Sequence, residues 1–201
     1  MGSIIFDMDG TLWDSAENVA RAWNMAVGRN MFTEKDIKGV MGLTMTTIAE
    51  RFFPNETEEK RREFLEKCCE CENKYIRVYG GKLFPNTEST LRELSKRHRL
   101  FIVSNCQNGY IEAFLDFYKL GGLFEDTLCW GDNKLEKWEN IKLIIERNRL
   151  HDALYVGDTQ GDCDGAYRAG ARFAHAAYGF CTADRCDYRL NDISELLSID
   201  G

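Results

Sequence analysis

Short apolar runs that end in polar residues alternate along this chain with segments whose apolar residues recur at helical spacing. The apolar runs predict strands at residues 4–6, 100–103, 153–156 and, more weakly, 171–178. The helical spacing predicts helices over residues 87–97, 109–119 and 137–148. Because parallel strands need crossover connections, the alternation indicates a parallel sheet with helices on both faces. The expected fold class is therefore α/β, with a Rossmann-like doubly wound core.

One long segment, residues 14–80, carries helical patterns and no convincing strand. Asp14 is expected to begin its first helix, with Glu17 three residues later as in a capping box. Two further helices are predicted over residues 44–52 and 57–78. The charge-dense run from Glu58 to Glu72 is interpreted as a solvated helix face.

Turn-forming pairs at Gly80-Gly81 and Pro85-Asn86 mark the point where strands and helices begin to alternate again. An all-helical domain inserted after the first strand is the simplest explanation of this order. We expect this helical cap domain to comprise residues 14–80, and the core domain to comprise residues 1–13 and 81–201.

Composition limits the classes of function that fit the chain. Its 201 residues include 26 basic and 33 acidic side chains, a net charge of -7. This balance argues against nucleic acid and anionic membranes as partners, because both attract basic patches. No apolar run approaches the roughly 20 residues of a membrane span, and the first residues do not resemble a signal peptide, so a cytoplasmic protein is expected. The eight cysteines lack the spacing of a zinc site and are expected to be reduced thiols.

Polar side chains follow three of the predicted strands. They are Asp7 and Asp9 after the first strand, Ser104 and Asn105 after the second, and Asp158 and Asp162 after the third. Ligands of parallel α/β sheets collect at the carboxyl ends of the strands. We therefore expect these side chains to meet at one edge of the sheet, although they are far apart in the sequence.

The same residues lie within short motifs. In chain order these are DMDGT at residues 7–11, IVSN at 102–105, a lysine at a helix start, and VGDTQGD at 156–162. With a helical insertion after the first motif, the chain resembles the haloacid dehalogenase-like hydrolase superfamily over essentially its whole length. The resemblance is to the branch that includes phosphoglycolate phosphatases and β-phosphoglucomutase-like enzymes. It implies a phosphatase whose partner is a small phosphorylated metabolite.

The first motif supplies two carboxylates with different expected roles. Asp7 is placed to attack a phosphoryl group and form an aspartyl-phosphate. Asp9 is placed to protonate the leaving oxygen and then to accept a proton from water. Gly10 permits a tight turn, and backbone amides near Gly10 and Thr11 are candidate donors to phosphoryl oxygens. For the Thr11 hydroxyl, a bond to the loop backbone is equally expected.

Four carboxylates that converge on one edge would repel one another, so the cluster implies a bound cation. Mg²⁺ fits best, because it prefers oxygen ligands and commonly shares its shell with a substrate phosphate. The resemblance implies that Asp7, the backbone carbonyl of Asp9, and Asp158 bind the metal. It gives Asp162 a supporting place behind these ligands.

The remaining oxygens of the phosphoryl group need hydrogen-bond donors. The Ser104 hydroxyl and the Asn105 amide are candidates at the end of the second strand. Two lysines compete for the third motif, Lys134 and Lys137. Lys137 is favoured because it begins an amphipathic helix and would project from the N-terminal end of that helix; Lys134 would then be a solvated loop charge.

The helical insertion is expected to select the substrate, because the sheet edge described so far recognises only a phosphoryl group. Residues 38–50 form the candidate selective segment, and Lys38 is its only cation. A strong clamp for a second phosphate is therefore not expected, and a small neutral or hydroxylated phosphomonoester fits best. Arg21 or Arg51 remains able to add positive charge.

Two other functions use the same core. Related sugar-phosphate mutases carry a histidine in a cap helix, and residues 18–20, Asn-Val-Ala, offer none at the corresponding place. A non-catalytic phosphate-binding regulatory protein is the second alternative, although the complete set of acidic and hydroxyl residues favours catalysis. The sequence leaves the oligomeric state open.

Overall fold

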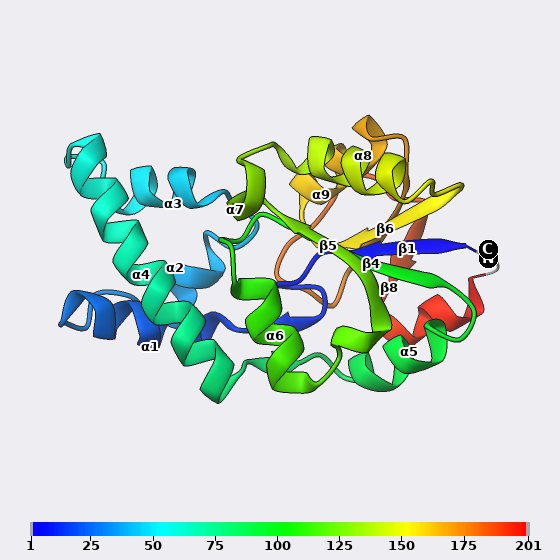
Figure 1. Ribbon diagram of the computed structural model, residues 1–201, viewed down its shortest axis with the longest axis horizontal. Coiled ribbons are helices and arrows are strands. Elements are labelled where there is room, and N and C mark those ends of the chain that lie inside the picture. Colours follow the sequence, from blue (N-terminus) through cyan, green and yellow to red (C-terminus); the bar gives the residue numbers. More distant parts are fainter. Residues whose placement is uncertain (1, 200–201) are drawn as a thin grey trace.

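A six-stranded parallel sheet forms the centre of the computed structural model, which describes residues 2–199 (Figure 1). Its strands, in spatial order, are β5 (Phe124–Cys129), β4 (Arg99–Ser104), β1 (Ser3–Phe6), β6 (Ala153–Gly157), β7 (Arg172–Ala176) and β8 (Tyr188–Leu190). Each neighbouring pair is parallel. The four predicted strands are present, and the prediction missed β5 and β8, the two edge strands.

Helices cover both faces of this sheet, as predicted. Ile5 on one face packs with α8 (Lys137–Arg147) and α9 (Gln160–Arg168). Ile4 and Phe6, which point the other way, pack with α5 (Thr87–Leu94), α6 (Tyr110–Tyr118) and the 3-10 helix η2 (Ile193–Ser198). The alternation along β1 thus places one apolar face against each helical layer. A Rossmann-like doubly wound core is confirmed.

Residues 16–79 contain four helices, which Figure 1 shows gathered beyond one end of the sheet. They are α1 (Ala16–Val27), α2 (Glu34–Lys38), α3 (Met45–Phe52) and α4 (Glu58–Tyr79). Short strands β2 (Trp13–Asp14) and β3 (Lys82–Leu83) pair antiparallel where the chain enters and leaves this region. The prediction missed α2, whose single turn and a half is stabilised by a capping box of Thr33 with Asp36.

The start of α1 corrects one expectation. Asp14 was expected to cap this helix, but Ser15 occupies the N-cap position and Asp14 lies in β2. A carboxylate oxygen of Asp14 still accepts the amide hydrogen of Ala16 at 3.1 Å. The Ser15 hydroxyl is directed elsewhere, to a carboxylate of the first motif.

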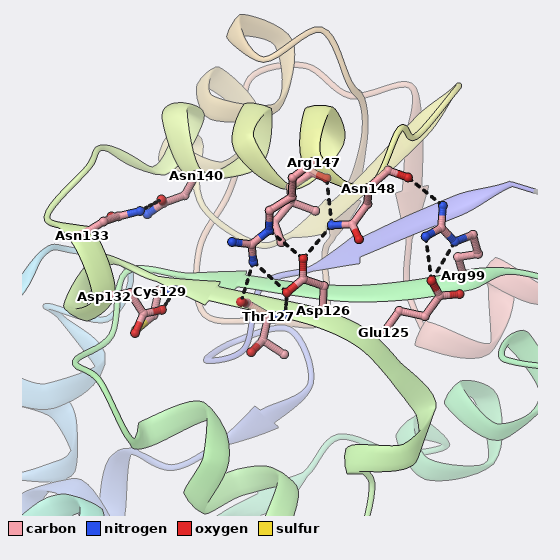
Figure 2. Close-up of polar contacts among 11 residues, drawn as sticks. Arg99, Glu125, Asp126, Thr127, Cys129, Asp132, Asn133, Asn140, Arg147 and Asn148 are labelled. Carbon is pink, nitrogen blue, oxygen red and sulfur yellow. Dashed lines mark hydrogen bonds and ion pairs between the residues drawn. The ribbon is translucent and has the colours of Figure 1, made fainter.

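A polar network fixes the C-terminal end of α8 against the sheet (Figure 2). Arg147 of α8 donates two hydrogen bonds of 2.7 Å to the Asp126 carboxylate of β5. The side-chain amide of Asn148 donates to the same carboxylate at 2.6 Å. Arg99 of β4 donates to the backbone carbonyl oxygen of Asn148 at 3.0 Å. Exposed pairs of this kind contribute about 0–1 kcal/mol each. Their effect is to set the position of α8, whose other end begins at Lys137.

Smaller elements complete the chain between β5 and α8. They are the 3-10 helix η1 (Gly121–Leu123), which precedes β5, and α7 (Trp130–Asn133), which follows it. The Asp132 carboxylate accepts the Cys129 amide at 2.9 Å, and Asn133 donates to Asn140 of α8 at 2.7 Å (Figure 2). These contacts hold the connection that carries the chain to the start of α8.

Candidate active site

Asp7 follows β1 directly and is almost completely buried, with 2% of its side chain exposed. Its backbone amide continues the ladder by donating to the Val156 carbonyl oxygen at 2.8 Å. The parallel pairing of β1 with β4 and β6 brings the carboxyl ends of all three strands to the same edge. Ser104 at the end of β4 and Asp158 after β6 therefore lie beside Asp7, as the sequence predicted.

Lys137 contacts two of the predicted acidic residues. Its Nζ donates to Oδ1 of Asp7 at 3.0 Å and to Oδ1 of Asp162 at 2.6 Å. All three side chains are buried. Lys134 instead donates to the Gly131 carbonyl oxygen and lies over the Trp130 ring, on the exposed side of the loop. The structure thus brings Lys137, the favoured lysine, to Asp7.

Asp162 is held by the start of α9 as well as by Lys137. Its Oδ2 accepts the amide of Thr159 at 2.9 Å and the Thr159 hydroxyl at 2.8 Å, while the Asp162 amide donates back to that hydroxyl. This capping box accounts for the buried position of a carboxylate one turn inside a helix. Both oxygens of Asp162 are therefore engaged within the chain.

Asp158 differs from Asp162 because one of its oxygens has no protein partner. Its Oδ2 accepts the amides of Phe180 and Cys181 at 2.9 and 3.2 Å. Its Oδ1 is buried and has no hydrogen-bond partner within residues 2–199. One oxygen from each of Asp7, Asp158 and Asp162 lies within 4.8 Å of the other two. An oxygen-rich group with one unsatisfied member fits a hard divalent cation such as Mg²⁺.

The electrostatics of this cluster favour a cation for the same reason. Burial raises the pKa of Asp7 to about 8, although the Lys137 ammonium opposes the shift. Burial, together with the charge of Asp162, raises the pKa of Asp158 to about 7. Burial lowers the pKa of the Lys137 ammonium, but the carboxylates of Asp162 and Asp7 raise it further, so the pKa lies above the ordinary value. One ammonium among three buried carboxylates leaves negative charge that a cation would neutralise.

Gly10 allows the loop after β1 to approach Asp158. Its φ is +81°, and a Cβ at this position would lie 2.4 Å from Oδ2 of Asp158. The backbone amides of Gly10 and Thr11 donate to the Trp13 and Met8 carbonyl oxygens, each at 3.0 Å. Both amides are thus engaged inside the turn. The Thr11 hydroxyl is buried without a partner among the described residues, so the expected bond to the loop backbone is not formed.

Asp9 has a different environment from Asp7, although only one residue separates them. Its Oδ1 accepts the Ser15 hydroxyl at 2.6 Å and the Tyr110 hydroxyl at 2.9 Å. Burial raises the pKa of Asp9 to about 6, against the effect of the Ser15 hydrogen bond. Sequence reasoning missed both partners, because a serine before one helix and a tyrosine at the start of another carry no distinctive spacing.

Glu72 of α4 was interpreted as part of a solvated helix face, and this interpretation is wrong. The side chain is 4% exposed, and its two oxygens accept hydrogen bonds from Trp23 Nε1 and, at 3.0 Å, from Gln107 Nε2. Burial raises its pKa to about 7. A signal was present in the sequence, because Cys68, Glu72 and Ile76 repeat every four residues and form the buried face of α4.

A cavity of about 40 Å³ lies between the sheet edge and the helices α1 to α4. Asp7, Asp9, Ser104 and Asn105 line it from the core, and Glu72 lines it from α4. The Asn105 side chain donates to the Gly42 carbonyl oxygen at 2.8 Å, so the loop before α3 is in contact with the sheet edge. Asp7, Asp9, Ser104 and Asn105 therefore face a space that the helices close.

Comparison with known proteins identifies the family to which the chain belongs. The family model described as haloacid dehalogenase-like hydrolase matches residues 4–176, which include every predicted site residue. The chain belongs to this family.

Relatives and solved structures support the same assignment for this haloacid dehalogenase-like hydrolase. The chain is 28% identical to the phosphoglycolate phosphatase of Aquifex aeolicus, over 99% of this chain and 96% of that protein. It is 26% identical to the phosphoglycolate phosphatase of Vibrio vulnificus, over 98% and 94% of the two chains. The predicted family is confirmed, and so is the predicted enzyme class, a phosphatase.

The fold is similar to that of solved structures of this family. A putative haloacid dehalogenase-like hydrolase from Bacteroides fragilis superposes with a TM-score of 0.85 at 23% identity, covering 98% of this chain and 100% of the other. A predicted phosphoglycolate phosphatase from Haemophilus somnus superposes with a TM-score of 0.84 at 21% identity, covering 98% and 97%.

Two further findings on this haloacid dehalogenase-like hydrolase concern membrane-spanning helices and the cysteines. No helix within residues 2–199 is both long and apolar enough to span a membrane. The eight cysteines all lie in the described part of the chain and are free thiols.

Proposed function

We propose that the chain is a Mg²⁺-dependent phosphatase that hydrolyses a small phosphomonoester through an aspartyl-phosphate on Asp7. The observation that carries this proposal is the buried group of Asp7, Lys137, Asp158 and Asp162 at the edge of the sheet. The names of the relatives support a phosphomonoester as substrate.

The first half of the proposed reaction transfers the phosphoryl group to the protein. A carboxylate oxygen of Asp7 forms a bond to phosphorus while the bond from phosphorus to the leaving oxygen breaks. Asp9 donates its proton to that leaving oxygen, so the product departs as an alcohol. The hydrogen bonds from Ser15 and Tyr110 hold the Asp9 carboxyl beside Asp7 for this step.

The second half returns the enzyme to its starting state. Asp9, now ionised, accepts a proton from a water molecule as the water oxygen attacks phosphorus. The bond between phosphorus and Asp7 breaks, and inorganic phosphate is released. The Ser104 hydroxyl and the backbone amide of Asn105 are proposed to donate hydrogen bonds to the phosphoryl oxygens. Lys137 is proposed to stabilise the charge of these oxygens.

Mg²⁺ would be held by Asp7, Asp158 and the backbone carbonyl of Asp9. The free Oδ1 of Asp158 supports its place as a ligand, and the engaged oxygens of Asp162 support a positioning role for that residue. When bound, the ion supplies positive charge that neutralises the substrate phosphate and the carboxylates around it.

Residues 14–80 are proposed to act as a cap domain over the core of residues 1–13 and 81–201. A cavity of about 40 Å³ is far below the roughly 300 Å³ of pockets that hold small molecules, so the helices must move to admit substrate. The contacts that would break are both polar and apolar, because buried residues of these helices and of the core belong to one hydrophobic cluster. The polar contacts include Asn105 with Gly42 and Gln107 with Glu72.

Hydrolysis of p-nitrophenyl phosphate in the presence of Mg²⁺ tests this proposal. The wild-type protein should release phosphate, and Asp7→Asn should lose at least about a thousandfold in kcat/KM, because the nucleophile is absent. Chelation should abolish the activity, and added Mg²⁺ should restore it. Asp152→Asn is the matched control, since Asp152 is exposed and its left-handed backbone conformation suits asparagine.

The Asp7→Asn measurement and the metal-removal measurement each have an outcome that would contradict the proposal. Turnover by a folded Asp7→Asn protein at the wild-type rate would exclude Asp7 as the nucleophile. Activity that persists without any divalent cation would exclude the proposed metal requirement.

A further inference from the structure

We propose that Glu72 determines which leaving groups this enzyme accepts, and that it favours a neutral or amine-bearing leaving group over one that carries a carboxylate. This inference rests on the phosphatase function proposed above and adds the substrate class. It would make Glu72 a specificity-determining residue contributed by α4, outside all of the sequence motifs.

Glu72 is placed to contact the leaving group. It lines the same cavity as Asp7 and Asp9, and it enters from α4, on the side opposite the sheet edge. Phosphorus must bind next to Asp7, so the part of the substrate beyond the leaving oxygen extends past Asp9 toward the helices. A short leaving group would therefore lie close to the Glu72 carboxylate.

Three acidic side chains line the cavity, Asp7, Asp9 and Glu72, and no lysine, arginine or histidine among residues 2–199 does so. Asp9 is protonated when substrate binds in the proposed reaction, so the negative charge next to the leaving group is that of Glu72. An anionic leaving group would find no counter-charge on this side, whereas the phosphoryl group has Lys137 and the proposed metal on the other. Burying an additional unpaired carboxylate here would be costly.

Three cations of the helical region, Lys38, Arg21 and Arg51, are engaged elsewhere. Lys38 pairs with Asp14 and Glu34 at 2.7 and 2.6 Å. Arg21 pairs with Glu17 on the exposed face of α1. Arg51 donates to the Gly39 carbonyl oxygen at 3.0 Å. The possibility that Arg21 or Arg51 brings positive charge to the site is therefore not realised in this closed arrangement.

Glu72 keeps acceptor capacity for a substrate donor. Each of its oxygens accepts one hydrogen bond from the protein, from Trp23 or from Gln107, and a carboxylate oxygen can accept two. A hydroxyl or ammonium group on the substrate would use the remaining lone pairs. The fixed partners hold the carboxylate in place, so its orientation does not depend on the substrate.

Three phosphomonoesters with two-carbon leaving groups test the inference, because they match in size and differ in charge. They are O-phosphoethanolamine, 2-hydroxyethyl phosphate and 2-phosphoglycolate, which end in an ammonium, a hydroxyl and a carboxylate. At pH 8, the wild type should hydrolyse the first two with kcat/KM at least about tenfold above the third, as expected for one unfavourable charge contact. A preference for 2-phosphoglycolate would overturn the inference.

Glu72→Gln separates a charge effect from a structural one. The variant should raise kcat/KM for 2-phosphoglycolate, lower it for O-phosphoethanolamine and change 2-hydroxyethyl phosphate least. A change of all three in equal proportion would overturn the inference, because loss of a purely structural contact affects all substrates alike. Glu59→Gln is the matched control, since Glu59 is an exposed residue of the same helix.

Failure of this inference can be told apart from failure of the proposed function. The p-nitrophenyl phosphate assay with Asp7→Asn reports on the nucleophile and is independent of the charge of a two-carbon leaving group. An active enzyme that prefers the carboxylate substrate would retain the proposed function and lose only the assignment to Glu72.

Discussion

Asp7 and Asp9 are two residues apart, yet they belong to regions with different charge arrangements. On the Asp7 side, the ammonium of Lys137 pairs with the carboxylates of Asp7 and Asp162, and one oxygen of Asp158 has no partner within residues 2–199. On the Asp9 side, hydroxyl groups and the Glu72 carboxylate line a cavity without a basic side chain in the described chain. With the proposed metal ion, the first region would hold an anion, whereas the second offers an anion no counter-charge.

This difference separates two tasks of a phosphatase. Recognition of the phosphoryl group requires positive charge, which Lys137 at the start of α8 and the proposed metal ion would supply. We propose that α1 to α4 recognise the leaving group, and within the described residues the one charged side chain that they bring to the cavity is Glu72. A change of substrate can therefore arise on the helices without altering the residues proposed for chemistry.

Removal of Lys137 should have the largest effect on this contrast. Lys137→Met should lower kcat/KM for p-nitrophenyl phosphate by at least about a thousandfold and destabilise the fold by about 3 kcal/mol, because Asp7 and Asp162 lose their partner. Steady-state kinetics and chemical denaturation measure the two effects. Lys134→Met is the matched control, and equal losses in both variants would contradict the assignment of Lys137.

Asp158 and Asp162 should differ in their effect on Mg²⁺. Asp158→Asn should weaken binding of the ion by about a hundredfold, since it removes the charge from an oxygen with no protein partner. Asp162→Asn should weaken it by about tenfold, because its oxygens are already bound by Lys137 and Thr159. Titration calorimetry with MgCl₂ measures both affinities. The reverse order would show that Asp162 is the direct ligand.

The smallest expected effect concerns the pH dependence of stability on the Glu72 side. Burial raises the pKa of Glu72 from 4.5 to about 7, so the folded state binds its proton more tightly than the unfolded state. The free energy of unfolding should therefore fall as pH rises between these values, and Glu72→Gln should remove the part of that dependence that Glu72 contributes. Asp9 titrates in the same range in both proteins.

Urea denaturation at several pH values between 4 and 8 gives the comparison needed for Glu72. Parallel stability curves for the wild type and Glu72→Gln would contradict the assignment of this carboxyl as a buried titrating group. Glu59→Gln serves again as the control, and its curve should follow that of the wild type.

Much of the sheet was predictable because its central strands are buried on both faces and read as apolar runs. The edge strand β5 was missed because Glu125 and Asp126 interrupt its apolar residues, and β8 because only three residues form it. An edge strand has one partner and tolerates polar side chains, so hydrophobicity alone does not identify it. The same limit applies to α2, which is too short for a helical period to appear.

The position of the predicted site residues could be predicted because parallel strands end at one edge of the sheet, which brings Asp7, Ser104 and Asp158 together. The side chains that helices bring to the site could not be predicted in this way. Tyr110 and Glu72 reach the site through the packing of α6 and α4, which depends on tertiary contacts and not on motif spacing. Glu72 was concealed further by the charged residues around it, although its four-residue spacing from Cys68 and Ile76 marked the buried face.

The hydrogen bond between Trp23 and Glu72 gives the closed cavity a built-in optical reporter. The Trp23 indole is 2% exposed, and its N–H is bound to a carboxylate in the cavity wall. Indole emission responds to hydration and to nearby charge, so entry of a ligand or withdrawal of α1 and α4 from the sheet edge should change the emission of this residue. The difference between the spectra of the wild type and Trp23→Phe would isolate that signal, and stopped-flow fluorescence would then follow closure in real time without an attached dye.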